Sequence, residues 1–349
     1  MTDLALNPTL AIYDTRLDQN NLPFKVGGAN STAVRTDTSW TVNTTEGELA
    51  YTTSVTGEGL TYDLAGNLSG GTIHGVQVIE KAPGELLGDL LYRVGDGFSV
   101  DVASFDPETG LTGLLEQGLA QGANIAVPVG AVGTTAAVHG YAGDDYFLAG
   151  GLDLETLNVE GGAGIDTMGL VHVQNLSSLT QTAFGWSLQD FETQINLANV
   201  ERVQGIDPLN PSNNISRALD LDGNAGQAAR LLGALAGADA LQNEALVGEA
   251  ISYVDTYGID GISQQLVDWG VVDSLAGGTD SASLVTTLFE NIAGTAPSPA
   301  ELDEFTGYID SGVWTKADAL DFAAGLDQTA QTIDLVGLSQ TGLEFTPFG

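Results

Sequence analysis

Glycine and aspartate crowd residues 136–172, and this segment constrains the fold more than any other part of the chain. Its clearest stretch, Gly161–Met168, reads GGAGIDTM and fits the repeat pattern G-G-x-G-x-D-x-U at every specified position, where U is a large apolar residue. Glycine tolerates the positive φ angles of a tight turn, and the apolar residue can begin a short inward-facing strand. The pattern therefore predicts short strands wound into a roll, with glycine turns along its edges.

Two related copies precede this stretch. The first, Gly140–Phe147, has Tyr141 in place of one glycine. The second, Gly150–Leu157, is degraded, because Asp153 replaces the inner glycine and Glu155 replaces the aspartate. The carboxylates at 145, 155 and 166 are ten and eleven residues apart rather than nine, so we expect an imperfect register with a bulge in the middle turn.

The turns predict calcium binding, because aspartate and backbone carbonyls supply hard oxygen ligands. Calcium takes about six to eight oxygens, more than one turn can offer, so an ion would be shared between loops stacked on neighbouring turns of the roll. This gives one or two sites at most. The alternative is that glycine and aspartate simply make turns between strands. The candidate ligand positions are Gly140, Gly143, Asp144, Asp145, Asp153, Glu155, Gly161, Gly162, Gly164 and Asp166.

The composition favours oxygen ligands and excludes several other kinds of site. None of the 349 residues is cysteine, which excludes disulfides, zinc–thiolate sites, iron–sulfur clusters and cysteine nucleophiles. The three histidines, at 74, 139 and 172, form no H-E-x-x-H pair. With 46 acidic and 9 basic residues the net charge is −37, so binding to nucleic acid or anionic lipid through phosphate neutralisation is excluded.

The chain carries no signal for membrane insertion. No apolar run approaches the ~20 residues that a membrane helix needs. The start, Met1–Leu4, lacks the basic region and hydrophobic stretch of a secretory signal, so we expect a soluble chain whose export would use another address.

Residues 1–135 alternate apolar and polar side chains in short runs broken by glycine. Threonine, valine and aromatic residues in 48–55, 71–79 and 98–102 predict strands with tight turns. One helix is expected over Leu111–Gln121, where leucines recur at helical spacing.

Helical periodicity dominates the chain beyond a proline-punctuated stretch that ends near Asn214. Apolar stripes predict helices in Ala225–Leu241 and Ser281–Ile292. Helix-start signals occur at Ser298 and Thr315, and Gly312 is expected to end the helix between them. The segment DLDGN at 220–224 fails the EF-hand spacing, so we expect Asp222 or Asn224 to cap a helix instead.

These patterns predict a multidomain β plus α fold. We expect a β-rich N-terminal domain over residues 1–135, as a sandwich or a solenoid, a short calcium-binding β-roll over 136–196, and a linker with an all-α bundle over 197–349.

The glycine-rich segment resembles the haemolysin-type repeats of secreted bacterial proteins, the RTX family. The resemblance covers about 35 residues. It implies a parallel β-roll that calcium folds outside a Gram-negative cell, and export by a type I secretion system that reads an uncleaved C-terminal signal. It would also account for the missing N-terminal signal, and for the single basic residue, Lys316, in the last sixty residues.

The C-terminal third resembles the DUF4214 family, a helical module often found after such repeats in secreted and surface-layer proteins. The resemblance rests on the segments 199–204 and 219–227, on Leu284–Gly294 and Glu301–Gly312, and on the closing IDLVGL at 333–338. It implies a module for export, display or assembly and no established reaction.

The sequence thus favours a secreted, calcium-dependent structural or self-assembling protein, such as a surface-layer, matrix-fibre or adhesion subunit. Its expected partners are further copies of itself and the type I secretion machinery, without nucleic acid or membrane insertion. It contains no G-x-S-x-G elbow, S-x-x-K box, P-loop or dinucleotide fingerprint, so we expect no enzyme. The alternatives are a haem or other small-molecule binder using Tyr62 and His74, in faint resemblance to secreted haemophores, and a hydrolase with an unrecognised carboxylate pair.

Overall fold

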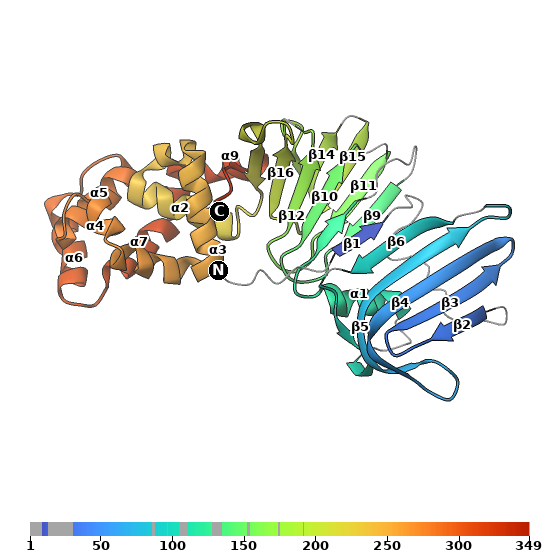
Figure 1. The fold of residues 1–349 in the computed structure, drawn as a ribbon. Helices are drawn as coiled ribbons and strands as arrows, with labels where there is room; N and C mark the ends of the chain where they lie inside the picture. Colours follow the sequence, from blue (N-terminus) through green and yellow to red (C-terminus); the bar gives the residue numbers. More distant parts are fainter. Residues whose placement is uncertain are drawn as a thin grey trace. The chain divides into compact units, whose positions relative to one another are not determined.

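The computed structural model describes residues 9–12, 31–85, 88–95, 97–104, 110–127, 135–151, 154–173, 175–190 and 192–348. The chain forms two compact units, Met1–Asn214 and Ile215–Gly349. The first unit is built from β-strands and the second from helices, so the predicted β plus α fold class is confirmed (Figure 1). The finer boundaries predicted at 135 and 196 stay predictions.

The N-terminal part of the first unit is an antiparallel meander of long strands. In sheet order its strands are β6 (Asp89–Gly95), β5 (Leu68–Lys81), β4 (Leu49–Tyr62), β3 (Ser39–Glu46) and β2 (Ser31–Arg35). The short strand β7 (Val100–Asp101) pairs with β5, and the 3-10 turn η2 (Val102–Ser104) follows it. Figure 1 shows the meander in blue to cyan. The strand periodicity read from residues 48–55 and 71–79 therefore corresponds to real strands.

Helix α1 (Gly110–Leu119) occupies the predicted helical segment and contributes Leu114, Leu115 and Leu119, all fully buried, to the core of this unit. The ring of Phe98 packs on the helix so closely that a Cβ placed at Gly118 would lie 2.0 Å from it. Since apolar side chains in a core are close-packed, no side chain fits at that position.

The strand β1 (Thr9–Ile12) joins the meander to the roll. It pairs antiparallel with β6 on one side and parallel with β8 (Asn124–Ala126) on the other. The roll therefore continues the same sheet with a change from antiparallel to parallel pairing.

The roll consists of two sheets, and the chain crosses from one to the other after nearly every strand. The first sheet contains the parallel strands β8, β10 (Tyr146–Gly150), β12 (Thr167–Val171) and β16 (Arg202–Ile206). The second contains the parallel strands β9 (Thr135–His139), β11 (Thr156–Glu160) and β15 (Thr193–Ala198). It is extended antiparallel by β14 (Gly185–Asp190) and β13 (Thr180–Thr182). The short parallel β-roll expected from the repeats is thus present.

The interior of the roll is filled by one side chain from every second strand position, as the period of two along a strand requires. Phe147 and Met168 from the first sheet and Leu157 and Ile195 from the second are fully buried. The U residue of the repeat pattern accordingly faces inward in all three copies.

The second unit packs helices around an apolar core. They are α2 (Asn224–Ala236), η4 (Ala238–Gln242), α3 (Glu244–Asp268), α4 (Val271–Leu275), α5 (Ser281–Ala293), α6 (Pro299–Asp310), α7 (Lys316–Gly325), α8 (Asp327–Thr332) and α9 (Leu335–Thr341). Figure 1 draws them in yellow to red. Leu320, Val254 and Val272 are fully buried within this core. Among the described residues, no helix is both long enough and apolar enough to span a bilayer.

The helix starts read from the sequence are confirmed at α6 and α7. Ser298 accepts from the backbone N–H of Glu301 while the Glu301 carboxylate accepts from the N–H of Ser298, and Thr315 and Asp318 form the same reciprocal pair. The prediction for α2 is wrong. Gly223 is its N-cap, and it is the carboxylate of Asp220 that accepts from the N–H of Ala225, at 3.1 Å. Asn224 is already helical and donates its side-chain amide to Asp255.

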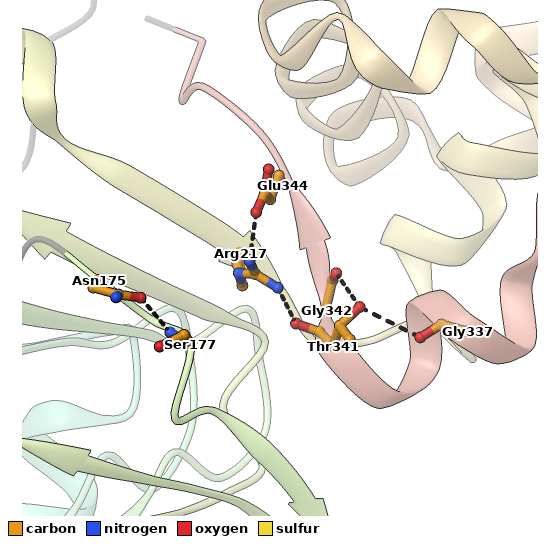
Figure 2. Close-up of polar contacts among 7 residues, drawn as sticks. All are labelled: Asn175, Ser177, Arg217, Gly337, Thr341, Gly342 and Glu344. Carbon is orange, nitrogen blue, oxygen red and sulfur yellow. Dashed lines mark hydrogen bonds and ion pairs between the residues drawn. The ribbon is translucent and has the colours of Figure 1, made fainter.

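The second unit begins and ends with paired strands, β17 (Ile215–Ala218) and β18 (Leu343–Glu344). Figure 2 shows Arg217 donating to the Glu344 carboxylate and to the carbonyl of Thr341. The same view includes a local turn of the first unit, in which the Ser177 amide donates to Asn175 Oδ1 at 2.7 Å. The Arg217 contacts hold the ends of the helical unit together.

Candidate functional site

The site lies along one edge of the roll, where the turns that lead into β10, β12 and β16 are stacked. The turn Gly140–Asp145 precedes β10, and Gly161–Asp166 precedes β12, 21 residues later. Backbone hydrogen bonds join the two turns, from Gly143 N–H to the Ala163 carbonyl at 2.7 Å and from Ala163 N–H to the Tyr141 carbonyl at 3.1 Å. The first and third repeat copies are therefore direct neighbours.

Glycine is required in these turns by both backbone angle and space. A Cβ at Gly161 would lie 1.8 Å from the Asn199 carbonyl oxygen, and one at Gly140 would lie 2.1 Å from Asp145 Oδ2. Gly143, Gly162 and Gly164 all have positive φ, at 85°, 107° and 145°. Tyr141, which replaces a glycine in the first copy, also has a positive φ, of 75°, where an L residue is strained.

The two aspartates that end the turns are buried and bridge neighbouring turns. Asp145, 2% exposed, accepts with Oδ1 from the N–H of Ala123 at 2.6 Å. Asp166, 0% exposed, accepts with Oδ1 from the N–H of Asp145 at 2.8 Å. Each carboxylate thus uses one oxygen to tie its turn to the turn before it.

The second carboxylate oxygens, Oδ2 of Asp145 and Oδ2 of Asp166, are buried and have no hydrogen-bond partner among the described residues. Each of these oxygens lies beside a glycine that is also close to a backbone carbonyl oxygen. A Cβ added at Gly140 would lie 2.4 Å from the Gly161 carbonyl oxygen, and one added at Gly161 would lie 1.8 Å from the Asn199 carbonyl oxygen. A buried acceptor without a donor destabilises the folded state by about 1–3 kcal/mol, and a charged acceptor does so by more. Two such oxygens beside carbonyls are suited to a cation or to protons.

Burial raises the pKa of both carboxyl groups. For Asp145 desolvation is the main cause, the nearby Asp166 charge adds to it, and the pKa rises to about 8. Desolvation likewise raises the pKa of Asp166 to about 6, although the hydrogen bond from the Asp145 amide opposes the shift. Burial therefore makes the ionised form of both carboxyl groups less favourable than it is in an exposed aspartate.

The predicted glycine positions lie in the same turns as this pair, whereas the acidic residues Asp144 and Glu155 are exposed rather than buried with it. Asp144 is exposed and accepts from the Ile165 N–H at 2.8 Å. Glu155 is exposed in the turn between β10 and β11. This turn follows β10, whereas the turn of Asp145 precedes β10, so Glu155 lies at the opposite edge of the roll. Asp153 lies outside the described residues. Among the described residues, no cluster of three or more histidine, cysteine or acidic side chains is arranged as a metal site.

The next turn of the stack, at Asn199 and Glu201, was not among the predicted site residues. Glu201 Oε2 accepts from the N–H of Asp166 at 2.8 Å, as the aspartates do for the turns before theirs. Asn199 has a positive φ of 48°, and its side-chain amide donates to Glu160 at 2.5 Å. The signal is weak because the β13–β14 hairpin separates this turn from the repeats, so that Glu201 follows Asp166 by 35 residues.

The residues of the haem alternative are not brought together. Tyr62 ends β4 opposite Leu68, and His74 lies six residues further along β5, roughly 20 Å away at ~3.3 Å per residue. The Tyr62 hydroxyl donates to the Thr36 carbonyl at 2.8 Å. This geometry offers no support for joint binding of one haem.

Hollows also occur away from this edge of the roll. Between α5, α6 and α7 is an apolar cavity of about 230 Å³, walled by Phe289, Phe305, Trp314 and Phe322. On the second sheet of the roll is a hollow of about 550 Å³ that both polar and apolar side chains line. Comparison of the chain with family models, with curated proteins and with solved structures finds no match.

Proposed function

We propose that this protein is a secreted, calcium-dependent structural protein of the bacterial cell surface, and that cations at the aspartate edge of the roll hold it in its working form. The observation that carries the proposal is a pair of buried oxygens, Asp145 Oδ2 and Asp166 Oδ2, that have no hydrogen-bond partner among the described residues. Removing a carboxylate from water without a counter-charge costs several kcal/mol, so such a pair needs either protons or a cation.

The residues present fit a hard cation. Asp145 Oδ2 with the Gly161 carbonyl and Asp166 Oδ2 with the Asn199 carbonyl are all-oxygen donor sets of the kind that calcium prefers. Two protein oxygens in each set are fewer than calcium needs, so water and further carbonyls would complete its shell. When bound, calcium would supply the positive charge that these turns lack. The protein's contribution is the stacking that brings the carboxylates and carbonyls together.

A structural rather than catalytic role is supported by the burial of this carboxylate pair. At 2% and 0% exposure, Asp145 and Asp166 offer no surface to a substrate. A glycosidase pair must flank its substrate in a cleft, which these two side chains cannot do. The hydrolase alternative would therefore need a different pair.

Self-association is supported by the free side of the meander. Among the described residues β2 is an edge strand that pairs with β3 alone, and Val34 on it is 64% exposed. An exposed strand edge can pair with another copy, and calcium would offset repulsion between acidic faces. We accordingly propose extracellular localisation after type I secretion, in keeping with the RTX and DUF4214 resemblances.

Dynamic light scattering and negative-stain electron microscopy of the full chain, with calcium and after chelation, test the proposal. We expect large particles with calcium that disperse on chelation and return when calcium is restored. The variant Asp145→Asn, Asp166→Asn should lose this response, whereas the exposed pair Asp303→Asn, Glu304→Gln should keep it. Particle size that ignores calcium in the unmodified protein would reject calcium-dependent assembly.

A further inference from the structure

The second roll sheet carries a hollow, lined by both polar and apolar side chains, that the calcium proposal does not use. Small residues among those that line it are Ala137 on β9 and Ala198 on β15. Around them stand Asn158 and Glu160 from β11. Because Leu157 and Val159 face the buried interior, the alternate positions 158 and 160 face outward.

Three side-chain amides cross this hollow as a hydrogen-bonded chain. Gln194 Nε2 donates to Asn196 Oδ1 at 3.1 Å, and Asn196 Nδ2 donates to Asn158 Oδ1 at 2.9 Å. Asn196 and Asn158 are paired in register on β15 and β11, so the chain runs along the sheet surface. Since each amide is held by its neighbour, a ligand would meet side chains that are already ordered.

The amide chain leaves hydrogen-bonding groups open at both of its ends. Among the described residues, Gln194 Oε1 and Asn158 Nδ2 make no hydrogen bond, whereas the other groups in the chain are used. A hydroxyl group both donates and accepts, so it can satisfy either end. A ligand with several hydroxyl groups spaced along a rigid frame matches this arrangement.

An aromatic ring borders the same hollow. Phe184, in the turn between β13 and β14, lines it and is 90% exposed, which is unusual for so large an apolar side chain. Exposed aromatic rings stack on flat ligand faces that carry C–H groups, as one face of a pyranose ring does. The ring therefore supplies the apolar contact that complements the amides.

The charge of the surroundings selects against anionic ligands. The acidic residue that lines the hollow is Glu160, which accepts from Asn199 Nδ2, and the basic residue is His139, with no lysine or arginine among the lining residues. Side chains of several strands line the hollow, whereas an extended peptide would pair with backbone groups along a strand edge.

We propose that this hollow binds a neutral saccharide, which stacks on Phe184 and hydrogen-bonds through its hydroxyls to Gln194 Oε1 and Asn158 Nδ2. Its volume of about 550 Å³ lies within the range of about 300–1,000 Å³ usual for small-ligand sites and suits one or two sugar rings. The site stands independently of calcium binding at the edge of the roll.

The test is binding of the full-length protein, in calcium-containing buffer, to an array of neutral oligosaccharides built from hexoses, N-acetylhexosamines and deoxyhexoses. Sialylated and sulfated glycans on the same array are the acidic arm. Dissociation constants for the strongest neutral probe follow by calorimetry. We expect neutral glycans to bind and acidic ones to fail.

Three variants locate the binding. Phe184→Ala should weaken it at least about tenfold, the size expected for a lost aromatic stacking contact. Ala137→Tyr should abolish it by filling the hollow. Leu209→Ala, equally exposed at 91% but outside the hollow, should change nothing. Thermal melting checks folding, and removal of the exposed Phe184 should leave the melting temperature unchanged.

Three outcomes would overturn the proposal. They are an array on which no neutral glycan binds, a preference for the acidic glycans, and equal affinity of the unmodified protein, Phe184→Ala and Ala137→Tyr.

Discussion

The turns of the roll and the caps of helices α6 and α7 use carboxylates in the same way but with opposite electrostatic results. In both places an acidic side chain accepts from a backbone N–H that regular secondary structure leaves open. At the helix caps these hydrogen bonds lower the pKa of Glu301 and Asp318, which remain exposed to water. In the roll, burial outweighs them and raises the pKa of Asp145 and Asp166.

The difference lies in where the second carboxylate oxygen goes. At a helix cap it belongs to an exposed side chain, because Glu301 and Asp318 lie on the surface, and Asp318 Oδ2 alone accepts from both the backbone N–H and the hydroxyl of Thr315. In the roll it is enclosed by the next turn. A helix cap is therefore satisfied by neighbouring residues and water, whereas the stacked turns of the roll leave buried carboxylate charges that require a proton or a cation.

The largest effect is expected from closing the space beside these oxygens. Gly161→Ala would place a Cβ 1.8 Å from the Asn199 carbonyl oxygen, and we expect a loss of about 3 kcal/mol or failure of the roll to fold. Chemical denaturation measures it. The control is Gly307→Ala in α6, where a Cβ meets nothing within 4 Å and better helix propensity should add about 0.5–1 kcal/mol. Equal stability of both variants would contradict the described packing of the turns.

Calcium should stabilise the roll and leave the helix caps unchanged. At a concentration about 100 times its Kd, an ion that binds only the folded state adds about 2.7 kcal/mol. Hydrogen exchange resolves the two regions, and the amides of Asp145 and Asp166 should exchange more slowly with calcium while those of Glu301 and Asp318 do not respond. Uniform protection, or none, would count against a site at the roll edge.

Protons should substitute for calcium in part. Both roll aspartates have a pKa above the ordinary 3.8, so the folded state retains protons that the unfolded state releases as the pH rises from about 4 to 8. The calcium-free protein should therefore lose stability through this window, on a scale of about 1.4 kcal/mol for each unit of pKa difference.

Melting temperatures between pH 5 and pH 8, with and without calcium, measure this effect. The benefit of calcium should be greatest at pH 8. In Asp145→Asn, Asp166→Asn the fall with pH should be shallower, and an unchanged slope would mean that other groups cause it.

The smallest effect is expected at a helix cap. Ser298→Ala removes one partner of the capping box and should cost about 1 kcal/mol, with no dependence on calcium. Hydrogen bonds from Ser298 lower the pKa of Glu301, which contributes only while it is ionised, so the cost should shrink as the pH falls below the ordinary pKa of 4.5. If the shift in the denaturation midpoint of Ser298→Ala changed with calcium, the helix cap would not differ from the roll in the way described.

Local signals in the sequence predicted much of this architecture. The caps at Ser298 and Thr315, the helix over 111–121 and the inward U residues of the repeats each depend on neighbours within a few positions, which is why they could be identified. The cap of α2 was missed because Asp220, Asp222 and Asn224 are equally suitable acceptors, and the backbone path selects Asp220.

By itself, the sequence determined that glycine turns would join short strands into a roll and that aspartates would stand at the turns, because those choices depend on φ angles and on a period of two along each strand. Which turns become neighbours depends on how the strands of the roll are stacked. Asp145 and Asp166, 21 residues apart, lie in neighbouring turns, and Glu201, which follows a hairpin, lies in the next turn of the same stack. Glu155 lies at the opposite edge of the roll. The tertiary structure also assembles the amide chain on the outer sheet. The physical reason is that burial, unpartnered oxygens and cross-strand neighbours are properties of the stack, since each arises only when one turn covers another.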